Sequence, residues 1–208
     1  MSESQQRVMF TSFEKKIDEM ADRGLIFLDS VVDLDCTAEF SRAIMYMTMR
    51  KLDRPTGLGK QPIWIYLNSL GGVLHCGLAI HDMIRGVVEM GIEVNILGVG
   101  IVASMSAAIM QAGTKRYALP HTQFLIHQVS QTISGHEEVN EEEERVEETK
   151  RVNRIVMGII ADRTGMNLEE LLKTSKKRDC WYSADDATRF GSRGLIDMIR
   201  YTLPILAV

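Results

Sequence analysis

The fold is decided by the stretch IWIYLNSLGGVLHCGLAIHDMIRGVVE at residues 63–89. Its first five residues are β-branched, aromatic or aliphatic, which is typical of a buried strand. Polar and glycine residues at 68–72 interrupt that run, and apolar residues then recur at helical spacing from 73 to 89. A strand, a glycine-rich turn and a helix in this order form the unit from which parallel sheets are built.

The same alternation extends in both directions along the chain. We expect further strands at 25–28, 94–97, 114–118 and 123–126, and further helices at 13–20, 36–51, 103–111, 136–163, 167–173 and 183–190. The segment 98–100, with two glycines, is expected to end the strand before it. Four consecutive glutamates at 141–144 are typical of a solvated helix face. We therefore predict one α/β domain over residues 24–208, preceded by an arm and first helix at 1–23.

The composition is that of an ordinary globular domain without a surplus of positive charge. The 208 residues are 45% hydrophobic and 25% charged, with a net charge of −4, which disfavours a nucleic-acid partner. No apolar run of about 18 residues predicts a transmembrane helix, and the polar start lacks the features of a secretory signal. Cys36, Cys76 and Cys180 are far apart, which is typical of reduced thiols. We therefore expect a cytoplasmic protein that is not bound to a membrane.

Residues 98–103 match the glycine pattern of a dinucleotide-binding turn, but the rest of that site is missing from the sequence. The pattern requires an acidic residue about 20 positions further on, which binds the ribose. No aspartate or glutamate occurs between Glu93 and Glu137. The five histidines also lack the spacing of a metal-ligand set. We therefore expect neither a nucleotide cofactor nor a metal.

A serine, a histidine and an aspartate occupy positions suited to catalysis. Ser104 lies at the start of the predicted small-residue helix, where N–H groups favour developing negative charge, although serine is also a common helix N-cap. His127 follows the strand predicted at 123–126, where an imidazole could act as a base. Asp179 precedes a short apolar step and could orient that imidazole or cap a turn. The residues alone leave these alternatives open.

Several segments together resemble the proteolytic subunits of Clp protease, the ClpP type. They are residues 68–72, 77–83, 100–108, 118–120, 126–128 and 178–187, which read NSLGG, GLAIHDM, GIVASMSAA, ALP, IHQ and RDCWYSADDA. The similarity is collinear from about Gly24 to Asp197. It implies a ClpP/crotonase-like fold of repeated ββα units, with a protruding long helix in a handle region at about 128–161.

The resemblance also implies an activity and the residues that perform it. The activity would be that of a serine endopeptidase, which degrades unfolded proteins and peptides without a cofactor. The catalytic residues would be Ser104, His127 and Asp179. The backbone N–H groups of Gly72 and Met105 would form the oxyanion hole.

An assembly and a partner are implied as well. Similar subunits stack as two heptameric rings, a tetradecamer, into a barrel that receives substrates from a separate AAA+ unfoldase. Trp64 and Tyr66 are two positions apart on one strand and face the same side, and with Tyr117 they would line the pocket where that ATPase docks. The chain has no phosphate-binding loop of its own, so the energy for unfolding must come from the partner.

Three departures from the family pattern leave a second interpretation open. Leu70 replaces the usual proline before the two glycines, Ser106 replaces a glycine, and Lys177 stands where an acidic residue is common. The chain could accordingly be a catalytically weak or inactive ring subunit that acts with a paralogue. A third interpretation, an acyl-CoA enzyme of the crotonase type, is disfavoured because residues 94–136 contain no carboxylate side chain.

Overall fold

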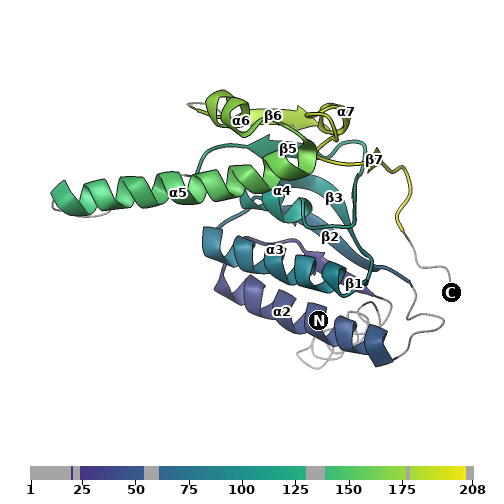
Figure 1. Ribbon diagram of the computed structural model, residues 1–208. Coiled ribbons are helices and arrows are strands. Elements are labelled where there is room, and N and C mark those ends of the chain that lie inside the picture. The colour runs from purple at the N-terminus through teal and green to yellow at the C-terminus, as the bar shows by residue number, and fades with distance from the viewer. Residues whose placement is uncertain (1–19, 21–23, 54–60, 130–138, 177–178, 205–208) are drawn as a thin grey trace, which may run out of the picture.

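Figure 1 shows the computed structural model, which describes residue 20 and residues 24–53, 61–129, 139–176 and 179–204. For residues 139–143 it describes the backbone alone. The predicted arm and first helix, apart from Met20, lie outside the described residues, as does Lys177. None of the helices in these ranges combines the length and the apolarity needed to cross a bilayer.

The described strands form one mainly parallel sheet. They are β1 (Leu25–Leu28), β2 (Ile63–Ser69), β3 (Val94–Ala103), β4 (Lys115–Ala118), β5 (Gln123–Ile126), β6 (Cys180–Ser183) and β7 (Met198–Ile199). Their order is β1-β2-β3-β4-β7, all in parallel, and β5 pairs in parallel with a second part of β3. The remaining strand, β6, is antiparallel to β5. The predicted α/β fold is therefore confirmed.

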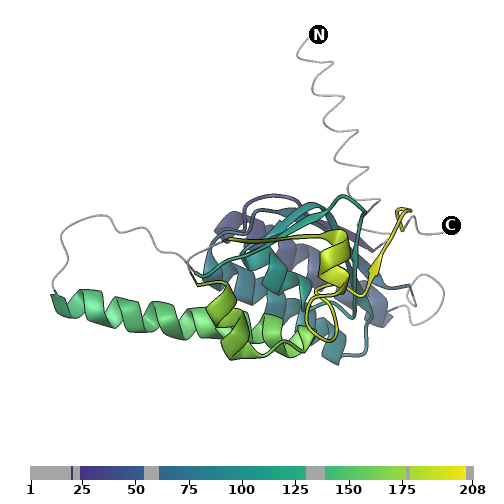
Figure 2. The same cartoon turned by 90° about the horizontal axis from the view of Figure 1, so that it is seen from above.

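The helices lie close to the positions predicted from the sequence. They are α2 (Leu34–Asp53), α3 (Leu74–Glu89), α4 (Met105–Met110), α5 (Val139–Thr164), α6 (Leu168–Thr174) and α7 (Ala184–Thr188). Figures 1 and 2 show α2, α3 and α4 on one face of the sheet, where fully buried residues such as Ile65, Ile80 and Ile96 form the core. The N-terminal half of α5 extends away from the body of the domain, as the resemblance implied.

The glycines at 98 and 100 do not end β3, and this part of the prediction was wrong. β3 pairs with β4 over Asn95–Gly98 and then with β5 over Ile101–Ala103. Gly100 has φ +68°, which bends the strand between its two partners. The Oδ1 atom of Asn68 accepts a hydrogen bond of 3.1 Å from the Ile101 N–H, so the strand continues past the bend. A single strand therefore reaches as far as the residue before Ser104.

Two other boundaries differ from the prediction. Asn68 and Ser69 were expected to interrupt the strand but belong to β2, which continues through an irregularity to pair Ser69 with Val102. The step after Asp179 is the strand β6, and the helix predicted from 183 begins at Ala184 instead. Both segments are stabilised by pairing with strands distant in the sequence, which local patterns do not reveal.

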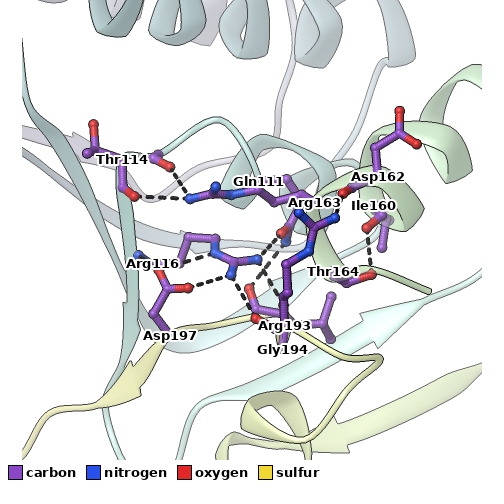
Figure 3. A network of polar contacts seen from close by, with 12 residues as sticks. Gln111, Thr114, Arg116, Ile160, Asp162, Arg163, Thr164, Arg193, Gly194 and Asp197 are labelled. Carbon is purple, nitrogen blue, oxygen red and sulfur yellow. Dashed lines mark hydrogen bonds and ion pairs between the residues drawn. The ribbon is translucent and has the colours of Figure 1, made fainter. Parts of the chain in front are cut away.

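A buried arginine anchors the C-terminal end of α4. Arg116 is 2% exposed, and Figure 3 shows it between Asp197, Gln111 and the loop at 193–194. Its guanidinium donates hydrogen bonds to the Asp197 carboxylate at 2.5 Å, to Gln111 Oε1 at 2.7 Å and to the Gly194 carbonyl at 2.9 Å. Because Gln111 caps the end of α4, this network fixes the short helix that begins next to Ser104.

Candidate active site

Two glycines after β2 lie directly against the residues around Ser104. Gly71 has φ +87°, and a Cβ atom there would lie 2.8 Å from the Met105 nitrogen and 2.9 Å from the Ser104 Cβ. A Cβ atom at Gly72 would lie 2.3 Å from the carbonyl oxygen of Val32. Glycine is therefore required at both positions, and it allows this loop to approach Ser104 and Met105 closely.

Ser104 is held in a strained backbone conformation. Its φ of 55° is the one positive value among the described residues other than glycine. Such a conformation costs roughly 1–3 kcal/mol and persists where the surrounding structure enforces it. Here the Ser104 N–H donates a hydrogen bond of 2.9 Å to the Leu125 carbonyl. Ser104 occupies the N-cap position of α4, but its side chain makes no capping hydrogen bond, so capping does not account for the hydroxyl.

His127 and Asp179 lie beyond the end of the same strand pair. β5 and β6 are paired up to Ile126 and Cys180, so His127 and Asp179 are the next opposed positions. His127 lines a cavity together with Ser104, whereas Asp179 is exposed and lies outside the cavity wall. Within the described part of the chain, no hydrogen bond joins the side chains of these three residues. The structure therefore brings the serine and the histidine to one cavity and leaves the aspartate beside it.

The cavity has a volume of about 310 Å³, and the loop after β2, the segment around Ser104, the end of β5 and one face of α5 form its walls. Gly72 and Met105 both line it, and neither N–H donates a hydrogen bond to another described residue. Two unused donors beside a serine are suited to binding a developing oxyanion. The described residues contain no group of three histidine, cysteine, aspartate or glutamate side chains that could hold a metal ion.

The aromatic residues expected to bind a partner lie on the sheet face opposite the core. The Trp64 and Tyr117 rings stack at 5.4 Å, and the Arg200 guanidinium lies 5.3 and 5.2 Å from them. The Tyr66 hydroxyl donates a hydrogen bond of 3.5 Å to the Pro204 carbonyl. Burial raises the pKa of Tyr66, and the positive charge of Arg200 offsets only part of this rise. The Tyr66 ring stacks on Phe27 at 5.2 Å, and Trp64, over which the Arg200 guanidinium lies, is 6% exposed.

The sequence analysis missed the part of α5 that lines the cavity. Glu148, Val152, Val156 and Ile160 all contribute to the wall and are four residues apart. This spacing places them in one row along a helix face. The pattern was visible in the sequence, but only the fold shows that the row faces Ser104.

Comparisons with known proteins agree with this fold. A model of the Clp protease family matches residues 10–202. The chain belongs to the Clp protease family. The resemblance seen in the sequence is therefore confirmed.

Individual relatives in the family are proteolytic subunits. The ATP-dependent Clp protease proteolytic subunit 2 of Corynebacterium efficiens is 31% identical over 177 residues, which cover 84% of this chain and 82% of the relative. Proteolytic subunit 1 of Corynebacterium jeikeium is 33% identical over 170 residues, covering 80% and 83%. Proteolytic subunit 2 of Chlamydia abortus is 37% identical over 142 residues, covering 67% and 65%.

Proposed function

We propose that this chain is a serine endopeptidase subunit with Ser104 as its nucleophile. The observation that carries the proposal is the strained backbone of Ser104, whose uncapped hydroxyl lies at the same cavity as His127. Strained backbone of this kind is concentrated at functional sites, and it persists only where the surrounding structure enforces it. Membership of the Clp protease family supports peptides and unfolded polypeptides as the substrates.

In the proposed reaction the Ser104 Oγ attacks a peptide carbonyl carbon while His127 accepts its proton. The oxyanion that develops receives hydrogen bonds from the N–H groups of Gly72 and Met105. His127 then donates the proton to the leaving amine, and the resulting acyl-enzyme is hydrolysed by water with His127 again acting as base. Asp179 would hold the imidazole in the tautomer that this sequence of steps requires.

The reaction requires a hydrogen bond between His127 and Asp179, and none joins the two side chains among the described residues of this subunit. The two residues occupy opposed positions at the end of the β5–β6 pair, so the movement required is local to the end of that ladder. Catalytic hydrogen bonds are often long or absent before substrate binds. We therefore propose that ring assembly or substrate binding closes the triad.

The proposed assembly is a cytoplasmic barrel of two stacked heptameric rings, of one or two kinds of subunit. Its handle region at about 128–161 includes α5, which projects from the domain in a position suited to contact between rings. A separate AAA+ unfoldase of the Clp type would supply substrates and dock at Trp64, Tyr66 and Tyr117. The relatives are named as subunits of an ATP-dependent protease, which supports a partner of this kind.

Two observations favour a second candidate, a weak or inactive ring subunit that acts with a paralogue. The three side chains of the proposed triad are not joined by hydrogen bonds among the described residues. Ser106, next to the oxyanion donor Met105, is fully buried and its hydroxyl has no hydrogen-bond partner in the described structure. If the unpaired Ser106 hydroxyl displaced the start of α4, the Met105 N–H would move with it, and the oxyanion hole would weaken without a change of fold.

A serine-reactive fluorophosphonate probe distinguishes the two candidates. The full chain is labelled after separation by size under native conditions, with Ser104→Ala as the matched variant and Ser41→Ala as the control. Labelling of the ring-sized species that disappears only in Ser104→Ala supports the peptidase. No labelling in any oligomeric state supports the inactive ring subunit.

A further inference from the structure

A row of side chains on α5 forms one wall of the cavity that contains Ser104. Val152, Val156 and Ile160 make this wall apolar, and Glu148 continues the row by one helical turn towards the protruding end of the helix. At 1.5 Å per residue the row is roughly 18 Å long. A substrate side chain that enters beside Ser104 therefore passes along an apolar surface that ends at a carboxylate.

Glu148 is the single fixed charge among the described residues that line the cavity. Hydrogen bonds from Arg151 and the positive charge of that residue hold the pKa of Glu148 below its ordinary value, so the carboxylate is ionised at neutral pH. Among the described residues, none that lines the cavity is a lysine or an arginine, which would repel a second cation.

The ion pair with Arg151 leaves Glu148 able to bind a further cation. The two side chains are 50% and 61% exposed, and exposed ion pairs of this kind contribute little to stability. Arg151 donates one hydrogen bond of 2.7 Å to each carboxylate oxygen. An ionised carboxylate offers about four acceptor positions, so two remain for a ligand.

We propose that this cavity selects polypeptide segments with a lysine or arginine close to the cleaved bond, and that Glu148 is the residue that determines the selection. The inference rests on the proposed serine peptidase function and adds the class of substrate. Lysine and arginine place an apolar stem on an apolar surface and keep the cationic end at a polar group. Val152 and Val156 would contact the stem, and Glu148 would accept hydrogen bonds from the cation.

The test measures kcat/KM for short internally quenched peptides that differ at one position. Lysine, arginine or norleucine is placed in turn at each of the three positions on the acyl side of the cleaved bond. The wild-type chain is compared with Glu148→Gln and with Glu147→Gln. Glu147 is a close control, because it forms the same kind of ion pair at 2.7 Å, with Lys150, but lies outside the cavity wall.

We expect the wild type to prefer lysine or arginine over norleucine in at least one of the three positions. Glu148→Gln should reduce that preference about fivefold, which corresponds to the loss of one exposed ion pair, whereas Glu147→Gln should leave it unchanged. Higher ionic strength should also reduce the preference.

Two results would overturn the inference, and neither is confused with a failure of the proposed function. One is a wild type that cleaves norleucine peptides at least as well as cationic peptides in every position. The other is a preference that Glu148→Gln and Glu147→Gln change equally. In both cases fluorophosphonate labelling of Ser104 still reports whether the chain is a serine peptidase.

Discussion

The backbone N–H of Ser104 donates a hydrogen bond of 2.9 Å to the carbonyl oxygen of Leu125. Leu125 lies two residues before His127 on the same segment, so the separation of the proposed nucleophile and base is set by backbone pairing. The remaining distance between the Ser104 hydroxyl and the His127 imidazole depends on the rotamers of these two side chains. The alignment of Asp179 depends on a different strand pair, that of β5 and β6.

Replacing Asp179 should impair catalysis without preventing substrate binding. In the proposed triad the Asp179 charge fixes the imidazole tautomer, so for Asp179→Asn we expect kcat to fall by about 10²–10⁴-fold while KM changes little. Steady-state cleavage of a short peptide by assembled rings measures both constants. Asp185→Asn, at an exposed position in the first turn of α7, is the control and should retain full activity. Equal activity of the two variants would exclude Asp179 from the triad.

Gly71 should tolerate no side chain. A Cβ atom there would lie within 2.9 Å of Met105 N and Ser104 Cβ, so Gly71→Ala must displace the loop, and we expect kcat/KM to fall by at least about 100-fold. Gly86→Ala is the matched control, because no atom lies within 4 Å of its added Cβ and the position is helical. That control should keep its activity and gain roughly 0.5–1 kcal/mol in stability. An active Gly71→Ala enzyme would contradict the close approach described here.

The Arg116–Asp197 pair should stabilise the fold in a pH-dependent manner. Burial alone would raise the pKa of the Asp197 carboxyl, but hydrogen bonds and charge from Arg116 lower it below its ordinary value. The stabilisation is therefore complete above the unfolded pKa of about 4 and is lost as the pH falls through the folded pKa.

Urea denaturation at several pH values measures this effect. Asp197→Asn should lower the free energy of unfolding by roughly 1–3 kcal/mol at pH 7, because the 38% exposure of Asp197 reduces the cost below that of a fully buried pair. The difference from wild type should shrink below about pH 4, where the wild-type carboxyl becomes protonated. Glu89→Gln, which breaks the exposed pair with Arg85, should cost less than about 0.5 kcal/mol. A deficit for Asp197→Asn that is independent of pH would rule out the ionised pair as its cause.

Ser106→Ala should increase stability. The Ser106 hydroxyl is buried without a hydrogen-bond partner among the described residues, so its removal relieves a desolvation cost, and we expect a gain of about 1 kcal/mol. Ser175→Ala is the opposite control, because the Ser175 hydroxyl is buried and donates a hydrogen bond of 2.9 Å to the Leu171 carbonyl. That variant should lose a similar amount. Thermal melts at equal protein concentration compare the two, since subunit association also affects the midpoint.

The parts of the fold predicted correctly are those with a strong local pattern. The apolar runs at 25–28 and 123–126 and the helical spacing at 73–89 were sufficient to locate β1, β5 and α3, which begins one residue later than predicted. The continuation of β3 beyond Gly98 was missed, because a glycine can bend a strand as well as end it, and pairing with β5 decides the outcome. β6 was missed because its stability comes from antiparallel contact with a strand more than 50 residues earlier.

The sequence predicted candidate residues, of which the structure places Ser104 and His127 but not Asp179 at one cavity, and it did not predict the geometry of the site. Motifs in the sequence pointed to Ser104, His127 and Asp179, and to glycine where a close approach is needed. They did not indicate that Ser104 adopts φ 55°, because that value results from the Leu125 hydrogen bond and the adjacent glycine loop. Glu148 was overlooked, since its place in the cavity wall depends on how α5 packs on the domain.

The positive φ at Ser104 affects which residue type would be favoured at this position during evolution. Glycine adopts that conformation without strain, so a Ser104→Gly chain should fold at least as well while losing its nucleophile. In a subunit without a catalytic function, selection for stability would favour glycine at position 104. That a serine is still present at this position is therefore more easily explained in an enzyme than in a ring component that has lost its chemistry.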